Sequence, residues 1–224
     1  MEEKDLLEIN NYTKVLVPAI SYNLKTDNRL LIPFTDGDKI GFINHDGKIV
    51  VKPEYNMYYG ECYSESDYVR VIVNVPYGAK RSDDSISSYY RPIYGLINYK
   101  GDIIFPIEYL TIKPAIGNSF IYSVQSMDGN YGVITPEGKI IVPFGKYDYI
   151  GGFDRGYARV KIGKTTNGLV DNNCKWGLIN DVGNEVLPVE YDNIWNFYGK
   201  NISFTNIVKE NTTNRFSLIT NNNL

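Results

Sequence analysis

Histidine, cysteine and tryptophan are scarce in this chain of 224 residues, which contains one, two and two of them respectively. His45 precedes Asp-Gly in an expected turn, and a general base needs a nucleophile or a carboxylate placed beside it. Cys62 and Cys174 lie far apart, without a CxxC pair or a nearby histidine, so a disulfide scaffold or zinc site is not expected. The sequence therefore predicts no enzyme, no metal and no cofactor.

A net positive charge and long apolar runs are also lacking. The formal net charge is -3 and the pI is about 5.3, whereas a nucleic-acid-binding protein carries a basic patch. No stretch approaches the roughly 20 apolar residues of a membrane span, and the start Met1-Glu-Glu-Lys has acids where a secretory peptide is basic. These absences predict a cytoplasmic protein that binds neither nucleic acid nor membrane.

A short sequence motif recurs along the chain. An aromatic or aliphatic residue, a small residue and branched aliphatics occur five times, as Ile40-Gly-Phe-Ile, Tyr94-Gly-Leu-Ile, Tyr131-Gly-Val-Ile, Trp176-Gly-Leu-Ile and Phe216-Ser-Leu-Ile. Four copies run into a turn with glycine third, which indicates a hairpin with positive φ. A second apolar strand follows, and because proline cannot donate to a ladder, we expect it to end at Pro53, Pro106, Pro143 and Pro188. A tyrosine comes shortly after each proline.

Another β-rich segment precedes each copy, and two of these, "YVRVIVN" and "YARVKIG", alternate with the period of a half-buried strand. The unit is thus about 40 residues long, which is the length of one propeller blade. The copy at Phe216 lacks the proline-ended strand, whereas Val15-Leu-Val-Pro18 supplies such a strand without a preceding copy. We therefore predict one domain, residues 1–224, folded as a closed five-bladed β-propeller in which Val15–Pro18 pairs with Phe216–Thr220. An open β-solenoid is the alternative.

The stretches "KWGLINDVGNEVLPVEYDNI", "YGLINYKGDIIFPIEY" and "YGVITPEGKIIVP" resemble the bacterial WG-repeat family, although the tryptophan itself is present only at Trp176. The resemblance implies a β-rich repeat protein without assigned chemistry, with binding roles that include toxin-neutralising immunity. The resemblance does not imply a catalytic residue at any position of this sequence. We expect Trp176 and its counterparts to be buried, one in each blade.

Departures from the repeat are where a binding site is expected, because loops on a rigid scaffold carry function. The main departure is a long loop from Asn74 to Pro92, rich in tyrosine, serine and paired charges, as paratopes are; a solvated hairpin is the plain alternative. Trp195 is either an edge filler or an exposed anchor. The predicted partner-binding residues are Glu61, Glu65, Asp67, Tyr77, Asp83, Asp84, Tyr89, Tyr90 and Trp195.

Three functions stay open at this point. The first is a non-enzymatic protein-binding module, such as an immunity or accessory protein that masks a bacterial partner. The second is a carbohydrate-binding propeller, for which the 20 tyrosines give weak support. The third is an enzyme that works in a central channel, and it ranks last.

Overall fold

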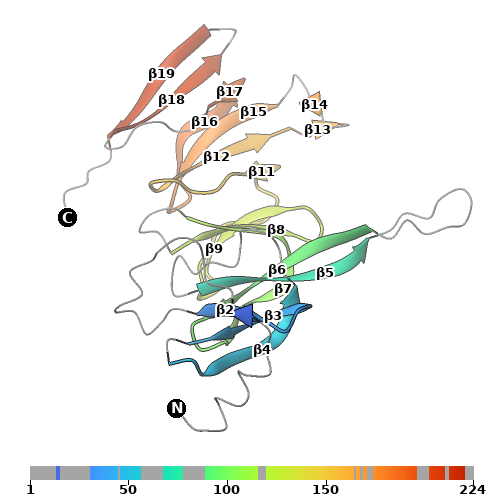
Figure 1. Ribbon diagram of the computed structural model, residues 1–224. Helices are drawn as coiled ribbons and strands as arrows, with labels where there is room; N and C mark the ends of the chain where they lie inside the picture. Colours follow the sequence, from blue (N-terminus) through green and yellow to red (C-terminus); the bar gives the residue numbers. More distant parts are fainter. Residues whose placement is uncertain are drawn as a thin grey trace, which may run out of the picture. The chain divides into compact units, whose positions relative to one another are not determined.

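The computed structural model describes residues 14–15, 31–44, 46–56, 68–77, 89–115, 120–163, 165–166, 169–170, 174–195, 202–209 and 212–219. Every regular element in these ranges is a β-strand (Figure 1). The predicted all-β class is therefore confirmed. His45 and Cys62 lie outside the described residues.

The chain divides into two compact units, residues 1–110 and 111–224. Each unit has its own core. The core of the first unit is built around Ile40, Phe42, Val51, Val71 and Ile97. The second unit has one cluster around residues such as Val133, Ile150 and Phe153, and another formed by Leu178, Leu187 and Ile194.

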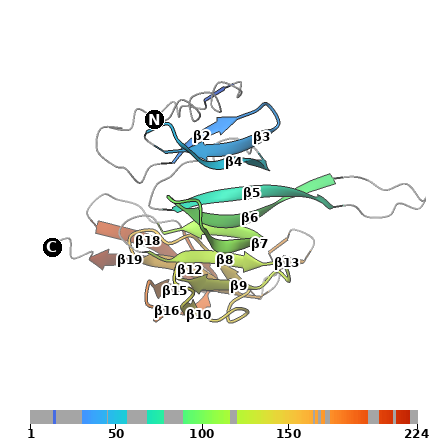
Figure 2. The ribbon, with the colours of Figure 1, turned by 90° about the horizontal axis from the view of Figure 1, so that it is seen from below.

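The first unit contains a four-stranded antiparallel sheet in the order β1-β2-β3-β4 and the strands β5, β6 and β7 (Figure 2). Their bounds are β1 Lys14–Val15, β2 Ile32–Thr35, β3 Lys39–Ile43, β4 Ile49–Asn56, β5 Tyr68–Tyr77, β6 Tyr89–Asn98 and β7 Ile103–Pro114. Strand β7 runs through the division at Leu110, so that its last residues belong to the second unit.

The second unit continues with β8, β9 and β10, which follow β7 in sheet order, and then forms the sheets β11-β12-β15-β16, β13-β14 and β17-β18-β19. The bounds are β8 Tyr122–Ser126, β9 Tyr131–Ile134, β10 Ile140–Val142, β11 Tyr149–Ile150, β12 Tyr157–Ile162, β13 Thr165–Thr166, β14 Leu169–Val170, β15 Lys175–Asn180, β16 Glu185–Tyr191, β17 Asn193–Ile194, β18 Ile202–Lys209 and β19 Thr212–Ile219. The predicted segments that precede each copy are thus confirmed as β2, β5, β8, β12 and β18.

The hairpin turns form as predicted, with positive φ at the third-position glycines Gly47, Gly101, Gly138 and Gly183. In the turn after β15, the Asn180 N–H donates to the Asn184 carbonyl and the Gly183 N–H donates to the Asn180 carbonyl. The Asn180 side chain also accepts a hydrogen bond from the Asn184 N–H at 2.8 Å. The side chain of an asparagine before such a turn accepts hydrogen bonds from backbone N–H groups that have no partner in the β-ladder.

The prolines do not end their strands in three of the four copies, so this prediction was wrong for Pro53, Pro106 and Pro188. Strands β4, β7 and β16 continue through them. In the fourth copy β10 does stop at Val142, before Pro143. The reason lies in the register, because Trp176 pairs with Tyr191 and Leu178 with Leu187, which leaves three residues of β16 opposite the single residue Gly177. Proline is tolerated in such a bulge because its missing N–H has no ladder partner there.

The bulge also explains the glycine of the repeated motif. A Cβ added at Gly177 would approach the Leu187 carbonyl oxygen to 2.9 Å, and one at Gly41 would approach the Val51 carbonyl oxygen to 2.5 Å. Because the bulged strand crosses directly over this position, a side chain has no room. The Gly, Pro and Tyr of the motif are therefore three parts of one local structure.

The motif aromatics are less buried than predicted. Tyr94, Tyr131 and Trp176 are half-buried, whereas Ile40 is fully buried. The side chain of Phe216 lies outside the described residues. The prediction of equivalent, largely buried positions is therefore confirmed for Ile40 and was wrong for the three described aromatics.

The structure does not test the predicted pairing of Val15–Pro18 with Phe216–Thr220, and it describes only the partners of these strands within their own units. Lys14 and Val15 pair with Thr35 and Phe34 of β2, while β19 pairs with β18. The N-terminal segment therefore supplies the first strand of a sheet that the following residues complete, as β11 does for β12. The rest of the predicted strand, through Pro18, lies outside the described residues.

Candidate functional site

The predicted loop between Asn74 and Pro92 is largely a hairpin. Strands β5 and β6 stay paired over ten positions, from Tyr68 opposite Asn98 to Tyr77 opposite Tyr89. Residues Asn74–Tyr77 and Tyr89–Pro92 are therefore strand, and only Gly78–Ser88 lie outside the described residues. In Figure 2 the paired ends of β5 and β6 extend past β7. The β-branched residues of this stretch, together with alternating polarity, favour the longer ladder.

The end of this hairpin carries an exposed aromatic side chain. Tyr90 is 68% exposed and lies directly opposite Pro76, which is also exposed. The hairpin is fastened to the preceding strand, because the Asn74 N–H donates to the Asn56 side chain at 2.9 Å. A rigid ladder thus presents a large aromatic ring that the core does not use.

The other predicted site residues fall in three places. Tyr77 and Tyr89 form the last described pair of the hairpin, and their side chains lie outside the described residues. Trp195 is 48% exposed and follows β17 in the second unit. The acidic residues Glu61, Glu65, Asp67, Asp83 and Asp84 lie outside the described part of the chain.

A second surface, in the second unit, was missed by the sequence reasoning. Directly paired residues of three neighbouring strands bring Tyr149, Lys161 and Trp176 into one line across the sheet, from β11 through β12 to β15. Lys113 and Arg159 lie beside this line. We call these five residues the cation–aromatic row.

Cations and rings are in contact along the row. The Lys113 ammonium lies 5.2 Å from the centre of the Tyr149 ring. The Arg159 guanidinium and the Lys161 ammonium lie 5.3 and 5.8 Å from the centre of the Trp176 ring. Such cation–π contacts hold long side chains in place and contribute about 0.5–2 kcal/mol each, depending on desolvation.

The rings of the row also touch each other. Tyr149 contacts Trp176 edge to face at 5.9 Å between ring centres, and contacts Tyr131 in the same way at 5.3 Å. The motif aromatics of two successive copies are therefore linked through one tyrosine. Burial, with a smaller contribution from Tyr149, raises the pKa of Tyr131, which keeps this phenol neutral.

The first unit shows which part of the row belongs to the repeat. Arg70 lies 5.3 Å from the centre of the Tyr94 ring, as Arg159 does over Trp176. Opposite Tyr94, however, lies Ile72, where Lys161 lies opposite Trp176. The sequence contains a signal for this difference. When "YVRVIVN" is aligned with "YARVKIG", Lys161 replaces Ile72, and the alternation of a strand places Lys161 on the same face of the sheet as Trp176.

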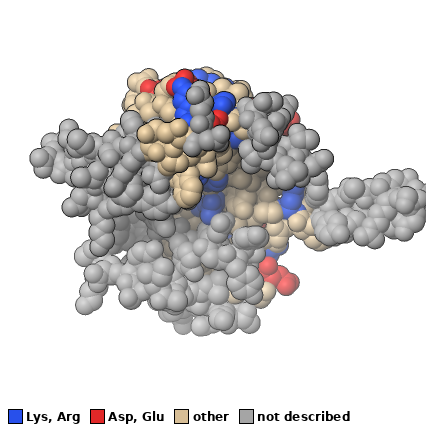
Figure 3. Space-filling model, turned by 90° about the horizontal axis from the view of Figure 1, so that it is seen from above, with Lys and Arg blue, Asp and Glu red and all other residues tan. Residues whose placement is uncertain are grey.

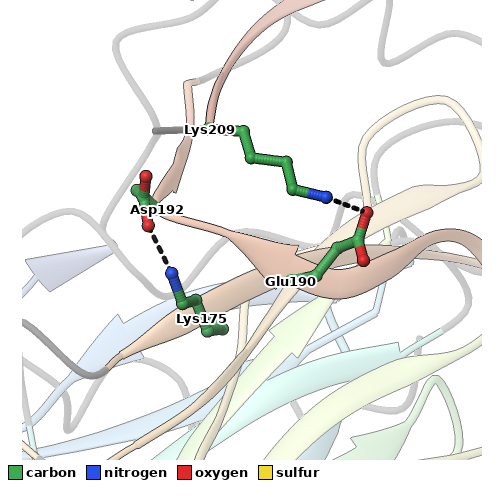
Figure 4. A network of polar contacts seen from close by, with 4 residues as sticks. All are labelled: Lys175, Glu190, Asp192 and Lys209. Carbon is green, nitrogen blue, oxygen red and sulfur yellow. Dashed lines mark hydrogen bonds and ion pairs between the residues drawn. The ribbon is translucent and has the colours of Figure 1, made fainter. Parts of the chain in front are cut away.

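Two lysines near the row already have carboxylate partners (Figure 4). Lys175 is bound to Asp192, and Lys209 is bound to Glu190 at 2.8 Å. Arg159, by contrast, donates to the neutral carbonyl of Ile194 at 2.8 Å. On the face drawn in Figure 3, basic and acidic side chains are interspersed at the top of the view.

The described residues were also compared with the needs of a metal site and of a membrane-spanning helix. Among the described residues, no group of three or more His, Cys, Asp or Glu side chains could hold a metal ion. No helix in the described residues is long and apolar enough to span a membrane. Exposed rings on rigid strands and a row of cations are features that suit binding.

Comparison with known proteins gives a family but no individual relative. The family of the WG containing repeat matches residues 40–74, 94–115, 131–165 and 176–206, which is more than half of the chain. Each match begins at a motif position, Ile40, Tyr94, Tyr131 or Trp176, and the copy at Phe216 lies outside them. No curated protein and no solved structure matches the chain. The four matches show that the chain belongs to the WG containing repeat family.

Proposed function

We propose that this protein is a non-enzymatic protein-binding module whose β5–β6 hairpin contacts the partner. The observation that carries the proposal is the exposure of Tyr90, 68%, at the end of a ladder of ten residue pairs. A tyrosine held on a rigid element loses little conformational entropy on binding, and tyrosines are enriched among the residues that dominate interface energies.

The position of the hairpin within the repeat also supports the proposal. Other copies join the equivalent strands by shorter connections, such as the one between Ser126 and Tyr131. The longer ladder is therefore not needed to complete the repeat. An immunity or accessory role, in which the chain masks a partner in a bacterial cytoplasm, is the form of this function that we favour.

Affinity capture with purified variants as bait tests the proposal. Replacing Tyr89 and Tyr90 with alanine should weaken the complex by about 2 kcal/mol or more, as for an interface hot spot. The melting temperature should stay nearly unchanged, because Tyr90 is exposed. Ile103→Ala is the matched control, since Ile103 is 62% exposed on a regular part of the repeat.

The outcomes separate the alternatives. A partner that is captured by the parent chain and by Ile103→Ala, but not by the double variant, supports the proposal. Capture of one protein set by all three baits would contradict it. Retention of the parent chain on immobilised polysaccharide, with loss on Tyr90→Ala, would favour the carbohydrate-binding alternative instead.

We also propose that the repeats form the blades of a five-bladed β-propeller. The support is that β1-β2-β3-β4 and β11-β12-β15-β16 are four-stranded antiparallel sheets whose strands follow each other in chain order, as in propeller blades. A closed ring should give a radius of gyration of about 17 Å by small-angle scattering, and an extended array a clearly larger one.

A further inference from the structure

We infer that two prolines, Pro76 on β5 and Pro92 on β6, close the edges of the β5–β6 hairpin against pairing with a strand of another chain. A protein partner is then met by side chains of the hairpin and not by its backbone. The closure of the edges follows from the geometry of the ladder alone, whereas the mode of partner contact rests on the proposed function and makes it more specific.

One hydrogen bond fixes the direction of the backbone groups along this ladder. The Asn74 N–H donates to the Asn56 side chain at 2.9 Å, so it points away from β6. In an antiparallel pair, the backbone groups of successive residues point alternately toward the partner strand and away from it, and directly opposite residues agree in this. Asn74 lies opposite Pro92, and Pro76 lies opposite Tyr90. The backbone nitrogens of Pro76 and Pro92 therefore lie on the outer edges of β5 and β6.

Each outer edge lacks a donor where a further strand would need one. Proline has no N–H, so β5 offers none at Pro76, and the N–H of Asn74 is already used within the chain. The pairing of β6 with β7 ends at Tyr94, and the next outward position along β6 is Pro92. In the described part of the hairpin beyond Tyr94, the outward N–H of Tyr90 is thus the one donor left to an added strand. Prolines on edge strands prevent edge-to-edge pairing in natural sheets.

The strands of the hairpin are otherwise suited to such pairing. The stretch Val71-Ile-Val-Asn-Val-Pro-Tyr77 of β5 contains no charged side chain, and the hairpin extends past β7 (Figure 2). Segments of six or seven residues with high β-propensity, low charge and no proline pair readily with other chains. Pro76 is what separates this stretch from that pattern.

The two prolines are not part of the repeat. When β5 is aligned with β12 and β6 with β15 by their ladders, the same offsets give Thr165 and Cys174 where the hairpin has Pro76 and Pro92. The prolines of the bulges, by contrast, recur from copy to copy. A copy of the repeat therefore does not require proline at either place, and both prolines occur where the hairpin is extended.

The closed edges leave the faces of the hairpin for a partner. Because Pro76 and Tyr90 are directly opposite, their side chains lie on the same face, and both are exposed. Opposite residues whose backbone groups point outward are the closer kind of pair, with about 4.5 Å between their Cα atoms. The two rings thus form one rigid apolar patch, which fits the surface of a folded protein. An extended segment that adds a strand is the partner that the edges exclude.

Self-association of a proline variant tests the closed edges. The double variant Pro76→Val with Pro92→Val restores both outward donors with a residue suited to strands. As the protein concentration rises, its average mass in sedimentation experiments should reach about twice that of the parent or more. The amide N–H groups at positions 76 and 92 should then exchange more slowly with solvent, which places the new pairing at the edges.

Pro106→Val is the matched control. Pro106 is also exposed, but it lies in the bulge of β7 opposite Gly95, so a donor restored there does not face an open edge. Its mass should stay that of the parent. The single variants Pro76→Val and Pro92→Val keep the inference testable if the double variant does not fold, and each should associate through its own edge.

Three results would overturn the closed edges. The first is a folded double variant with the mass of the parent at every concentration, and the second is equal association of Pro106→Val. The third is association without slower exchange at positions 76 and 92, since another surface would then be responsible.

Partner capture tests the mode of contact separately. At concentrations where it is monomeric, Pro92→Val should capture the partner with an affinity within about threefold of the parent, whereas a gain of about tenfold or more would mean strand addition and overturn contact through the face. Failure of the parent chain to capture any protein would contradict the proposed function and contact through the face together. Self-association would still decide whether the prolines close the edges, because it needs no partner.

Discussion

At the scale of single residues, the motif glycines are set by what lies across from them. Gly41 faces backbone atoms of the bulged strand, at 2.5 Å from the Val51 carbonyl oxygen for an added Cβ, whereas Gly132 faces the ring of Phe144 at 3.0 Å. Phe144 is 37% exposed and can move. The same motif residue is therefore constrained by rigid backbone in one copy and by a movable side chain in another.

This difference predicts unequal effects of one substitution. Gly41→Ala should lower the free energy of unfolding by about 1–3 kcal/mol or more, as overpacking does, and Gly132→Ala by less than about 1 kcal/mol. Urea denaturation followed by circular dichroism measures both. Equal losses would mean that the bulge does not impose the glycine.

The tyrosines that follow the prolines predict a dependence on alkaline pH. Burial, then the neighbouring Glu54, raises the pKa of Tyr55 to about 12, and burial with a hydrogen bond to Glu185 at 2.8 Å raises the pKa of Tyr147. A raised pKa means that the folded state favours the neutral phenol. The stability is therefore complete below the unfolded-state pKa of about 10 and is lost as the pH rises from there toward the folded-state value.

Each such tyrosine should lower the unfolding free energy by at most about 1.4 kcal/mol per pH unit in that window. Urea denaturation between pH 9 and pH 11.5 measures the slope, which Tyr55→Phe should reduce. Tyr90→Phe, on an exposed ring, is the control and should leave the slope as it is. An unchanged slope in Tyr55→Phe would contradict the assignment.

At the scale of elements, two of the hairpin turns contact the preceding copy of the motif. A Cβ added at Gly183 would lie 2.9 Å from the Ile141 carbonyl oxygen of β10, and one at Gly101 would lie 2.9 Å from the Val51 side chain of β4. At Gly138 an added Cβ would meet nothing within 4 Å. All three glycines have φ between +83° and +86°, so the turn geometry is the same and only the neighbour differs.

Alanine at these positions therefore separates turn strain from packing between copies. Both Gly138→Ala and Gly183→Ala should incur the strain of a positive φ, about 1 kcal/mol or somewhat more. Gly183→Ala should lose a further 1–3 kcal/mol, approximately, from overpacking against β10. The difference between the two unfolding free energies is the measurement, and a difference near zero would contradict the contact.

The strands and turns could be predicted because their signals are local. Alternation in "YARVKIG" and the glycine of each turn gave β12 and the hairpins directly. The bulges could not be predicted, because a bulge of three residues opposite one depends on how two strands pair. Pro188 by itself is equally compatible with the end of a strand and with a bulge. The choice between a loop and a hairpin at Asn74–Pro92 stayed open in the sequence, because serines and charges dominate the composition while the paired ends are short. The cation–aromatic row could not be predicted, because its residues come from four different strands, β7, β11, β12 and β15.

At the scale of the whole molecule, the two units have separate hydrophobic clusters. Phe42 is 1% exposed in the first unit, and both tryptophans, Trp176 and Trp195, lie in the second. Tryptophan fluorescence therefore reports on the second unit, whereas circular dichroism reports on both.

A core substitution in the first unit should consequently be seen unequally by the two methods. Phe42→Ala should destabilise the first unit by about 3–5 kcal/mol and shift part of the circular dichroism transition to lower urea. The fluorescence transition should keep its midpoint. Leu178→Ala, in the second unit, should shift the fluorescence transition instead. A common shift of both signals by Phe42→Ala would mean that the two cores unfold as one.

The junction between the first two long strands of a copy is the place where this chain changes length. It holds the extended ladder of β5 and β6 in one copy and the small β13–β14 hairpin in another, yet β12 and β15 remain paired at all six positions from Tyr157 to Ile162. An insertion at this junction thus leaves the rest of the sheet in register. A foreign peptide grafted between Tyr77 and Tyr89 would be displayed at the end of a ready-made β-ribbon, which makes the chain a scaffold for engineered recognition.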